Sequence, residues 1–183
     1  MRVRIMEEYG FAAAMFGLGF SYGRTSDFDY PENPLEETLY NRACKLASMG
    51  KGHNKFLRQI MLWIDCDAPL YWWKQFDQYK VATCTQSEST MHTLGKQQIQ
   101  SWHFEKGLPT STLFRLNSLK EAGDFDALNR ELPQSFLQRR VITMSYETLR
   151  AIVEQRTGHK LVEWKYFIDH MLEFVAYPEF LCK

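Results

Sequence analysis

The feature that most limits the fold is an apolar run in the first half of the chain. Between Phe56 and Ile64 most side chains are apolar, and the run then meets Asp65-Cys66-Asp67-Ala68-Pro69. The run suits a buried strand or the inner part of a helix, and its length and the acidic, proline-containing stop favour a strand. With 183 residues and 45% hydrophobic content, the chain suits one globular domain with a core that can bury this strand.

Helical and extended patterns alternate along the rest of the chain. We expect strands over Val3–Met6 and Phe136–Met144, and the polar residues and prolines of Arg24–Pro34 predict a surface loop. Good helix formers, amphipathic spacing and stop signals predict helices over Tyr9–Tyr22, from the end of that loop to Met49, and over Leu70–Gln78, Thr110–Ala122, Asp124–Leu132, Tyr146–Arg156 and Leu161–Val175.

The least regular segment is Thr83–Thr93, which is rich in Thr, Ser and Gln. It lacks the glycine and proline of an ordinary turn, and it lacks the periodicity of a packed element. We therefore expect this segment to line or cover a site.

Charge and cysteine spacing exclude several function classes. Lys plus Arg and Asp plus Glu balance at 22 each, so the bulk charge gives no attraction to nucleic acid or to an anionic membrane. Any anion site must therefore be local. The cysteines have no C-x-x-C spacing, so neither a metal site nor a disulfide framework is indicated, and a reducing cytoplasm is the simplest location. They are Cys44, Cys66, Cys84 and Cys182.

The apolar run Phe11–Phe20 is too short and too rich in glycine for a membrane span, and the acids Glu7 and Glu8 before it argue against a signal peptide. We interpret this run as a buried helix. The chain contains no G-x-G-x-x-G, P-loop, G-x-S-x-G, H-E-x-x-H or EF-hand pattern. Their absence argues against a doubly wound dinucleotide fold.

Polar side chains gather around the irregular segment. Cations and hydroxyl groups satisfy phosphate oxygens, and amides match the edge of a uracil ring, so the cluster suits recognition of a pyrimidine nucleotide. Its members are Lys74, Gln75, Gln78, Tyr79, Lys80, Thr83, Thr85, Gln86, Ser87, Ser89 and Thr90.

Two adjacent arginines, Arg139 and Arg140, lie on an expected strand. Neighbours on a strand point to opposite faces, so one guanidinium should point inward and needs an anionic partner. That partner is either a carboxylate of the protein or a bound phosphate. The aromatic helix beginning Tyr71-Trp72-Trp73 likewise suits either a subunit contact or burial in its own core.

Three further side chains have both a structural and a functional interpretation. Arg156 ends a helix, where the helix dipole already favours a cation. His159 follows directly and has the same ambiguity. His53 lies in a loop, where its ring is either merely solvated or faces a ligand.

The order of these landmarks resembles the flavin-dependent thymidylate synthases over most of the chain. The resemblance is carried by Gly52-His53, a strand ending in Ala68-Pro69, an aromatic helix with Gln75, the polar segment, Leu132-Pro133, a strand with Arg139, a helix ending in Arg156, and then His159 and Glu163.

The resemblance implies an α/β (α+β) fold, with a central mostly antiparallel sheet flanked by helices in a single domain over residues 1–183. It implies a homotetramer that methylates deoxyuridylate (dUMP) to dTMP, with methylenetetrahydrofolate as carbon donor and reduced flavin (FAD, with NADPH) as hydride source. Small size and compact loops fit a bacterial or phage source.

The family signature is Arg-His-Arg, seven spacer residues and Ser. Here the triplet is Gln78-Tyr79-Lys80 and the position after the spacer is Glu88. In the family this triplet holds the flavin, so the change removes much of its bidentate grip on anions. The flavin contacts that the resemblance implies are His53, Tyr79, Lys80 and His159.

The residues with which the family binds the nucleotide are better matched in this chain than those with which it binds the flavin. Gln75 corresponds to a glutamine on the nucleotide, Arg139 to a strand arginine on its phosphate, and Arg156 to an arginine against the uracil ring. Arg156 is therefore also the candidate catalytic residue. The family's arginine after the signature serine is replaced, because Thr90 and Met91 occupy that position. The full set of expected nucleotide contacts is Gln75, Thr83, Gln86, Ser87, Ser89, Arg139 and Arg156.

Three functions remain open at this point. The first is an active, diverged thymidylate synthase. The second is a relative that binds or sequesters a nucleotide without that chemistry, and the third is a structural or partner-binding protein that kept only the fold.

Overall fold

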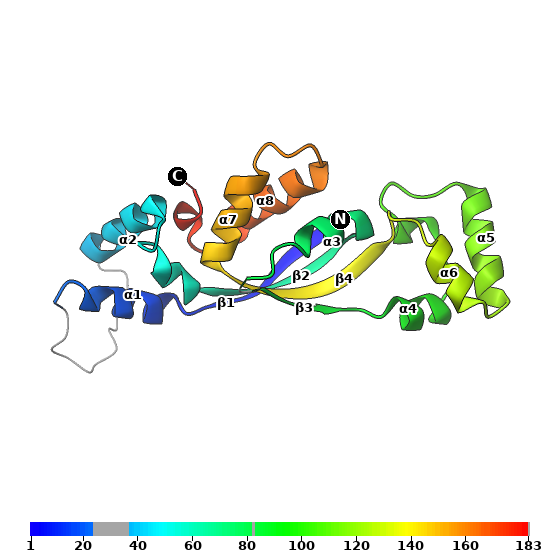
Figure 1. Cartoon of the computed structure of the whole chain (residues 1–183), viewed down its shortest axis with the longest axis horizontal. Coiled ribbons are helices and arrows are strands. Elements are labelled where there is room, and N and C mark those ends of the chain that lie inside the picture. Colours follow the sequence, from blue (N-terminus) through cyan, green and yellow to red (C-terminus); the bar gives the residue numbers. More distant parts are fainter. Residues whose placement is uncertain (24–36, 82, 183) are drawn as a thin grey trace. The chain divides into compact units, whose positions relative to one another are not determined.

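The computed structural model describes residues 1–23, 37–81 and 83–182, apart from the side chain of Met91 (Figure 1). The expected loop over Arg24–Pro34 lies outside these residues. The chain divides into two compact units, each assembled from distant parts of the sequence. The first unit comprises Met1–Arg4, Asp65–Tyr79 and Thr85–Val141, and the second comprises Ile5–Ile64, Lys80–Cys84 and Ile142–Lys183.

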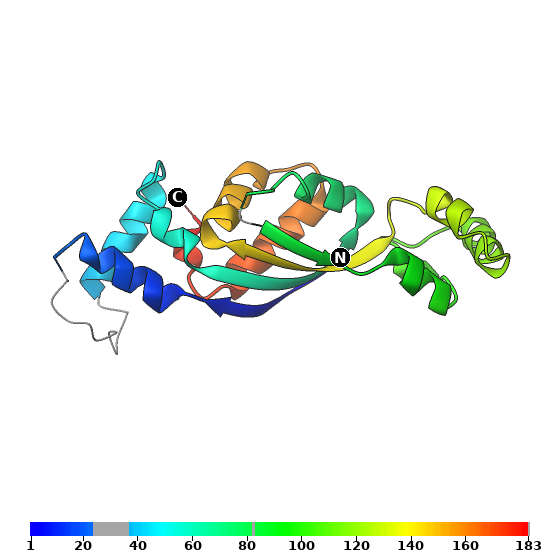
Figure 2. The ribbon, with the colours of Figure 1, turned by 60° about the horizontal axis from the view of Figure 1, so that its bottom comes forward.

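A four-stranded sheet with strand order β1-β2-β4-β3 contributes residues to both units. Its strands are β1 (Arg2–Tyr9), β2 (Met61–Pro69), β4 (Leu137–Ser145) and β3 (Thr83–Ser87), and β3 lies beside β4 at one edge (Figure 2).

Side-chain pairing gives the strand directions. Arg2 near the start of β1 pairs with Asp67 near the end of β2. Arg4 pairs with Asp65, two residues earlier on β2, so these strands are antiparallel. Asp65 also pairs with Arg139 on β4. The expected antiparallel sheet with flanking helices is confirmed.

Strand β2 differs from the expected strand at its start. It begins at Met61 because Lys55–Arg58 forms a 3-10 helix. It includes Asp65 and Asp67 and ends at Pro69, where the resemblance places the end of this strand. The carboxylates of Asp65 and Asp67 are only 12% and 11% exposed, and arginines on the neighbouring strands neutralise both. Paired acids can therefore remain inside a strand.

The segment Thr83–Thr93 is more regular than its sequence indicates, because it forms β3 and then helix α4 (Thr90–Lys96). Strand β3 lies at the sheet edge, and most of its side chains are exposed. An edge strand with little burial needs no apolar alternation, so the pattern on which strand prediction depends is missing.

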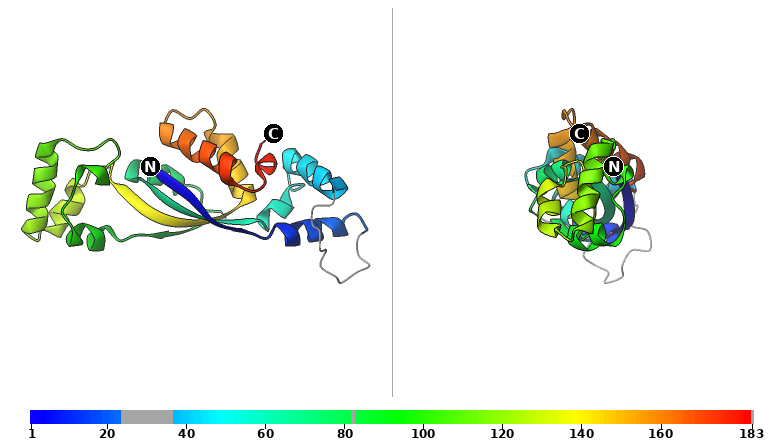
Figure 3. Two further views of the ribbon diagram at one scale, coloured as in Figure 1. Left: turned by 180° about the vertical axis from the view of Figure 1, so that it is seen from behind. Right: turned by 90° about the vertical axis from the view of Figure 1, so that its right-hand side faces the viewer.

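The first unit contains an aromatic helix with buried side chains and a separate apolar cluster between two other helices. Helix α3 (Leu70–Phe76) buries Trp72, Trp73 and Phe76, so its aromatic residues belong to the core. Helices α5 (Thr110–Glu121) and α6 (Phe125–Glu131) lie side by side (Figure 3). They share a core that contains Leu94, Ile99, Phe104, Leu116, Leu119, Leu128, Leu132 and Phe136.

In the second unit, α7 (Tyr146–Arg156) and α8 (Val162–Phe174) pack together, with the buried Trp164 and Phe167 on α8. Helices α1 (Phe11–Phe20) and α2 (Glu37–Met49) form a second pair. The bounds of α1, α7 and α8 agree with the expected ranges to within two residues. No helix among the described residues is long and apolar enough to cross a membrane.

Candidate functional site

A small pocket lies in the first unit where α4 and the start of β4 approach each other. We call it the α4–β4 pocket, and its volume is about 260 Å³. Its floor is apolar and includes Leu94, Ile99 and Phe136, which belong to the α5–α6 core. Trp102 and His103, on the 3-10 helix Ser101–His103, line one side. An apolar floor with a few polar groups at the rim is typical of small-molecule sites.

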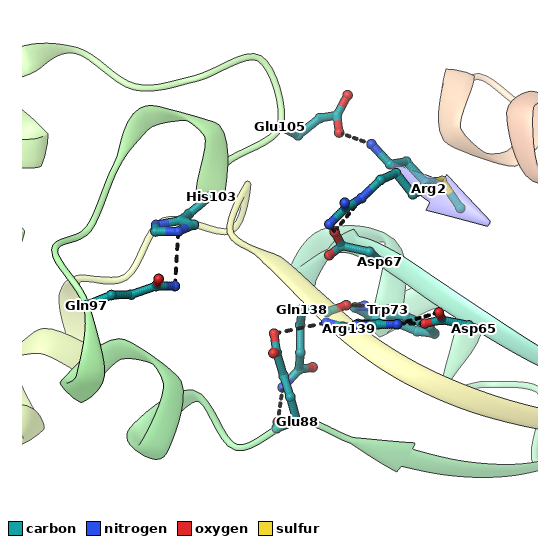
Figure 4. A network of polar contacts seen from close by, with 11 residues as sticks. Arg2, Asp65, Asp67, Trp73, Glu88, Gln97, His103, Glu105, Gln138 and Arg139 are labelled. Atoms are coloured by element: carbon teal, nitrogen blue, oxygen red, sulfur yellow. Dashed lines mark hydrogen bonds and ion pairs between the residues drawn. The ribbon is translucent and has the colours of Figure 1, made fainter. Parts of the chain in front are cut away.

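Ion pairs between neighbouring strands form part of the rim (Figure 4). Nε and Nη2 of Arg2 donate to Asp67 Oδ2 at 3.1 and 2.5 Å. Nε and Nη2 of Arg139 donate to the two carboxylate oxygens of Asp65 at 2.7 and 2.6 Å. The hydrogen bond from Arg139, with the positive charge behind it, holds the pKa of Asp65 below its usual range.

Glu88, which follows the triplet Gln78-Tyr79-Lys80 after seven spacer residues, is bound to β4 through both backbone and side chain (Figure 4). Its backbone N–H donates to Arg139 O, and its Oε1 accepts from Arg139 N, both at 3.0 Å. Gln138 Nε2 donates to Glu88 O at 3.3 Å. These bonds fix the chain between Ser87 and Ser89 next to Arg139.

The surroundings of His103 favour its neutral ring. Its Nδ1 accepts from the backbone N–H of Gln100 at 3.0 Å, so the proton of the neutral ring lies on Nε2. Nε2 is 3.3 Å from the side-chain nitrogen of Gln97, and the amide of Gln97 must present its oxygen here if Nε2 donates. Burial lowers the pKa of His103.

The inward member of the arginine pair is Arg140, whose side chain is 13% exposed. Its Nη1 donates to Asp77 Oδ1 at 2.8 Å, and its guanidinium lies 4.3 Å from the ring centre of Trp73. A protein carboxylate therefore satisfies the inward arginine, and Arg139 is the exposed one, at 60%.

Six of the residues expected to bind ligands lie in the first unit. Gln86 and Ser87 are exposed on β3, and Ser89 is the N-cap of α4. The ring of Tyr79 lies 6.2 Å from that of Phe76. The structure brings Ser87, Ser89 and Arg139 together through Glu88. The six are Gln75, Tyr79, Gln86, Ser87, Ser89 and Arg139.

The other expected ligand residues lie in the second unit, where two of them share one aromatic side chain. The guanidinium of Arg156 lies 4.7 Å from the ring centre of Trp164, and the ring of His159 meets the same indole edge-on at 6.4 Å. His159 Nδ1 accepts from Leu161 N at 3.1 Å. His53 is exposed in the loop after α2. Lys80 and Thr83 also belong to this unit.

Sequence reasoning missed the arginine and acid ladder on β1 and β2. Arg2 and Arg4 are two residues apart on one strand, and Asp65 and Asp67 are two residues apart on another. This spacing places each pair on a single sheet face, so the signal was present. The spacing can be interpreted as a set of ion pairs only when β1 is known to pair with β2. Trp102 was also missed. No metal-binding group of three or more His, Cys, Asp or Glu is present in the described part of the chain.

No family model and no curated protein sequence matches this chain. Solved structures do match it in fold. The flavin-dependent thymidylate synthase ThyX from Helicobacter pylori, complexed with FAD and dUMP, has a TM-score of 0.79 at 11% identity, over 99% of this chain and 98% of that one. A second structure of Helicobacter pylori ThyX with FAD and dUMP has a TM-score of 0.77 at 10% identity, over 99% and 97%.

A UMP/dUMP methylase, PolB from Streptomyces cacaoi bound with 5-Br dUMP, has a TM-score of 0.70 at 10% identity, over 98% of this chain and 93% of that one. The resemblance to flavin-dependent thymidylate synthases is thus confirmed at the level of the fold. At these identities the likeness extends to the fold alone.

Proposed function

We propose that this chain binds a pyrimidine nucleotide, with dUMP as the first ligand to test. The observation that carries the proposal is the ligand shared by the structural neighbours, because all three are described with dUMP or its 5-bromo derivative. The proposed nucleotide contacts are Gln75, Arg139 and Arg156, which the resemblance implies, together with four side chains of the polar segment, Thr83, Gln86, Ser87 and Ser89.

Arg139 is the proposed phosphate ligand. Its guanidinium is largely exposed on β4, beside a chain segment that Glu88 holds in place. In the structure the carboxylate of Asp65 accepts hydrogen bonds from Nε and Nη2 of Arg139. A phosphate must therefore use the other N–H groups of Arg139 or displace the carboxylate, and Asp65 sets part of the cost of binding.

Arg156 is the proposed contact to the uracil ring and the proposed catalytic residue if methylation occurs. Its guanidinium lies close to the face of Trp164, which limits its orientation. A flat, oriented guanidinium can donate in the ring plane to a carbonyl oxygen, which is the chemistry that uracil O2 and O4 need. His159, on the same indole, stays a proposed cofactor contact together with His53.

Thermal melts with dUMP, deoxyuridine, dAMP and inorganic phosphate test the proposal. A ligand at 100 times its Kd stabilises the folded state by about 2.7 kcal/mol, which for a chain of this length corresponds to a rise of roughly 5–10 °C in Tm. We expect dUMP to give the largest rise. Equal melting temperatures with and without millimolar dUMP would remove nucleotide binding as the function.

The second candidate is flavin-dependent methylation of dUMP to dTMP. Two neighbours that span 99% of this chain are described as complexes with FAD. At the position of the family's flavin triplet, however, Gln78 donates to Lys74 O, Tyr79 lies against Phe76, and Lys80 is exposed. The triplet has no guanidinium, so these residues do not fit FAD as the family holds it. We derive no chemical step through the flavin.

An absorbance spectrum separates the two candidates. Protein incubated with FAD and then desalted retains a flavin spectrum if methylation is the function, and a dUMP methylation assay with methylenetetrahydrofolate and NADPH then follows. Colourless protein that still gains stability from dUMP supports a nucleotide binder without flavin chemistry.

We also propose a homotetramer, which the resemblance implies, and a cytoplasmic location. The free thiols of Cys44, Cys66, Cys84 and Cys182 are consistent with a reducing compartment. Light scattering on the purified chain measures the assembly directly. A monomer at micromolar concentration would contradict the tetramer without bearing on nucleotide binding.

A further inference from the structure

A second hollow adjoins the α4–β4 pocket in the first unit. Arg2, Arg4, Arg139, Asp65 and Asp67 line it, and its volume is about 260 Å³. We call it the arginine hollow. The two hollows share Arg2, Asp67 and Arg139, and the α4–β4 pocket adds Glu88 and the apolar floor. A ligand with a ring at one end and an anion at the other matches this arrangement.

The charges of the arginine hollow favour an anion. Three guanidiniums surround two carboxylates, which leaves a net charge of +1 from the side chains that line it. The carboxylates of Asp65 and Asp67 are largely buried, whereas Arg2, Arg4 and Arg139 are exposed. The buried carboxylates therefore bind the arginines on the protein side, and the guanidinium groups are the part of the hollow that is exposed to solvent. Arg4 gives Asp65 only one hydrogen bond, at 3.2 Å, so most of its donors are not engaged by that carboxylate.

The α4–β4 pocket supplies the surface for a ring. The indole of Trp102 is 71% exposed, although it lines a pocket with an apolar floor. Its ring meets His103 edge-on at 5.7 Å, which gives it one fixed neighbour. An aromatic face of this kind binds a nucleobase by stacking, and the size of the pocket restricts the occupant to a single ring system rather than a dinucleotide such as FAD.

We propose that the arginine hollow and the α4–β4 pocket together bind one nucleoside monophosphate, with the phosphate on Arg2, Arg4 and Arg139 and the base stacked on Trp102. This assignment rests on the proposed function and adds three residues that the resemblance does not assign, Arg2, Arg4 and Trp102. Arg2 and Arg4 on strand β1 then take the place of the arginine that the family has at the position of Thr90. Arg2, Arg4, Arg139 and Trp102 all belong to the first unit.

The test uses two variants with matched controls in the same unit. Arg4→Gln removes one cation from the hollow, and Arg130→Gln removes an exposed cation that pairs with Asp126 on α6. Trp102→Ala removes the stacking surface, and Phe114→Ala removes an equally exposed ring on α5 that lines neither hollow. All four side chains are exposed, so each variant should keep the fold, and a circular dichroism melt checks this.

Isothermal titration with dUMP and with deoxyuridine gives the readout. We expect Trp102→Ala to weaken both ligands by roughly 10-fold or more. We expect Arg4→Gln to weaken dUMP by roughly 10-fold, to leave deoxyuridine unchanged, and to reduce the salt dependence of dUMP binding, because one exposed charge is lost. The control variants should bind as the wild type does.

The outcomes separate this assignment from the proposed function. Wild-type protein that binds dUMP while Trp102→Ala and Arg4→Gln bind it equally well would overturn the site and leave nucleotide binding intact. Wild-type protein that does not bind dUMP would overturn both. Inorganic phosphate serves as competitor, and displacement of dUMP by phosphate in the wild type but not in Arg4→Gln would support the anion position.

Discussion

Asp65→Asn should have opposite effects on stability and on nucleotide affinity. The carboxylate of Asp65 accepts two hydrogen bonds from Arg139 and one from Arg4. Both arginines are exposed, so each ion pair contributes less than about 1 kcal/mol, and the asparagine keeps one acceptor oxygen. We expect the free energy of unfolding to fall by about 1 kcal/mol and Tm by roughly 2–4 °C.

Affinity for dUMP should rise in the same variant. A phosphate on the far side of the Arg139 guanidinium would lie roughly 6 Å from Asp65, which is the span of one guanidinium with a hydrogen bond on each side. For exposed charges in a watery environment, removing that repulsion contributes about 1 kcal/mol, or roughly a 5-fold lower Kd. Isothermal titration of wild type and variant at the same ionic strength measures this ratio.

The pH dependence of stability gives an independent check. Because Arg139 lowers the pKa of Asp65, its contribution to stability is complete above the unfolded carboxyl pKa of about 3.9. It is lost as the pH falls through the lower folded-state pKa. The Tm difference between wild type and Asp65→Asn should therefore be constant near neutral pH and shrink in acid.

Asp126→Asn, in an exposed pair on α6, is the matched control and should leave the affinity unchanged. A folded Asp65→Asn protein that binds dUMP no more tightly than wild type would refute the competition between Asp65 and phosphate.

Three further predictions concern stability and protonation. Tyr146→Phe removes a buried hydroxyl that donates to Glu8 at 2.6 Å, and Tm should fall by roughly 5 °C while dUMP affinity is retained. Gly10→Ala places a Cβ 2.0 Å from Gln59 O at a φ of +94°, and chemical denaturation should show a loss of ~3 kcal/mol or more. The pKa of His103, measured by NMR titration, should lie below the usual value of about 6.5, and a higher value would contradict its burial.

Local signals in the sequence located most of the elements. The range expected for α7, Tyr146–Arg156, matches the structure because a polar residue precedes it and Thr157-Gly158 ends it. Strand β3 carries no such signal, since an edge strand buries little. The extension of β2 through Asp65 and Asp67 depends on arginines that lie more than 60 residues away in the sequence. Prediction rules that use only neighbouring residues in the sequence cannot detect such a pairing.

The candidate site divides in the same way. The strand alternation predicted that one of the two adjacent arginines points inward, and the structure assigns that position to Arg140. Arg139 was selected by the resemblance and not by this pattern. Arg2 and Arg4 could not be given a role before the pairing of β1 with β2 was known. No sequence pattern indicates a role for Trp102. A role can be inferred only from its position beside the apolar floor of the α4–β4 pocket.

The most direct test of the central claim is isothermal titration of dUMP into wild-type protein and into Arg139→Gln. We predict that wild type binds and that the variant loses about 2–4 kcal/mol of binding free energy, roughly 30-fold or more in Kd, because a phosphate loses its charged partner. No measurable binding by wild type, or equal binding by a folded Arg139→Gln protein, would contradict it.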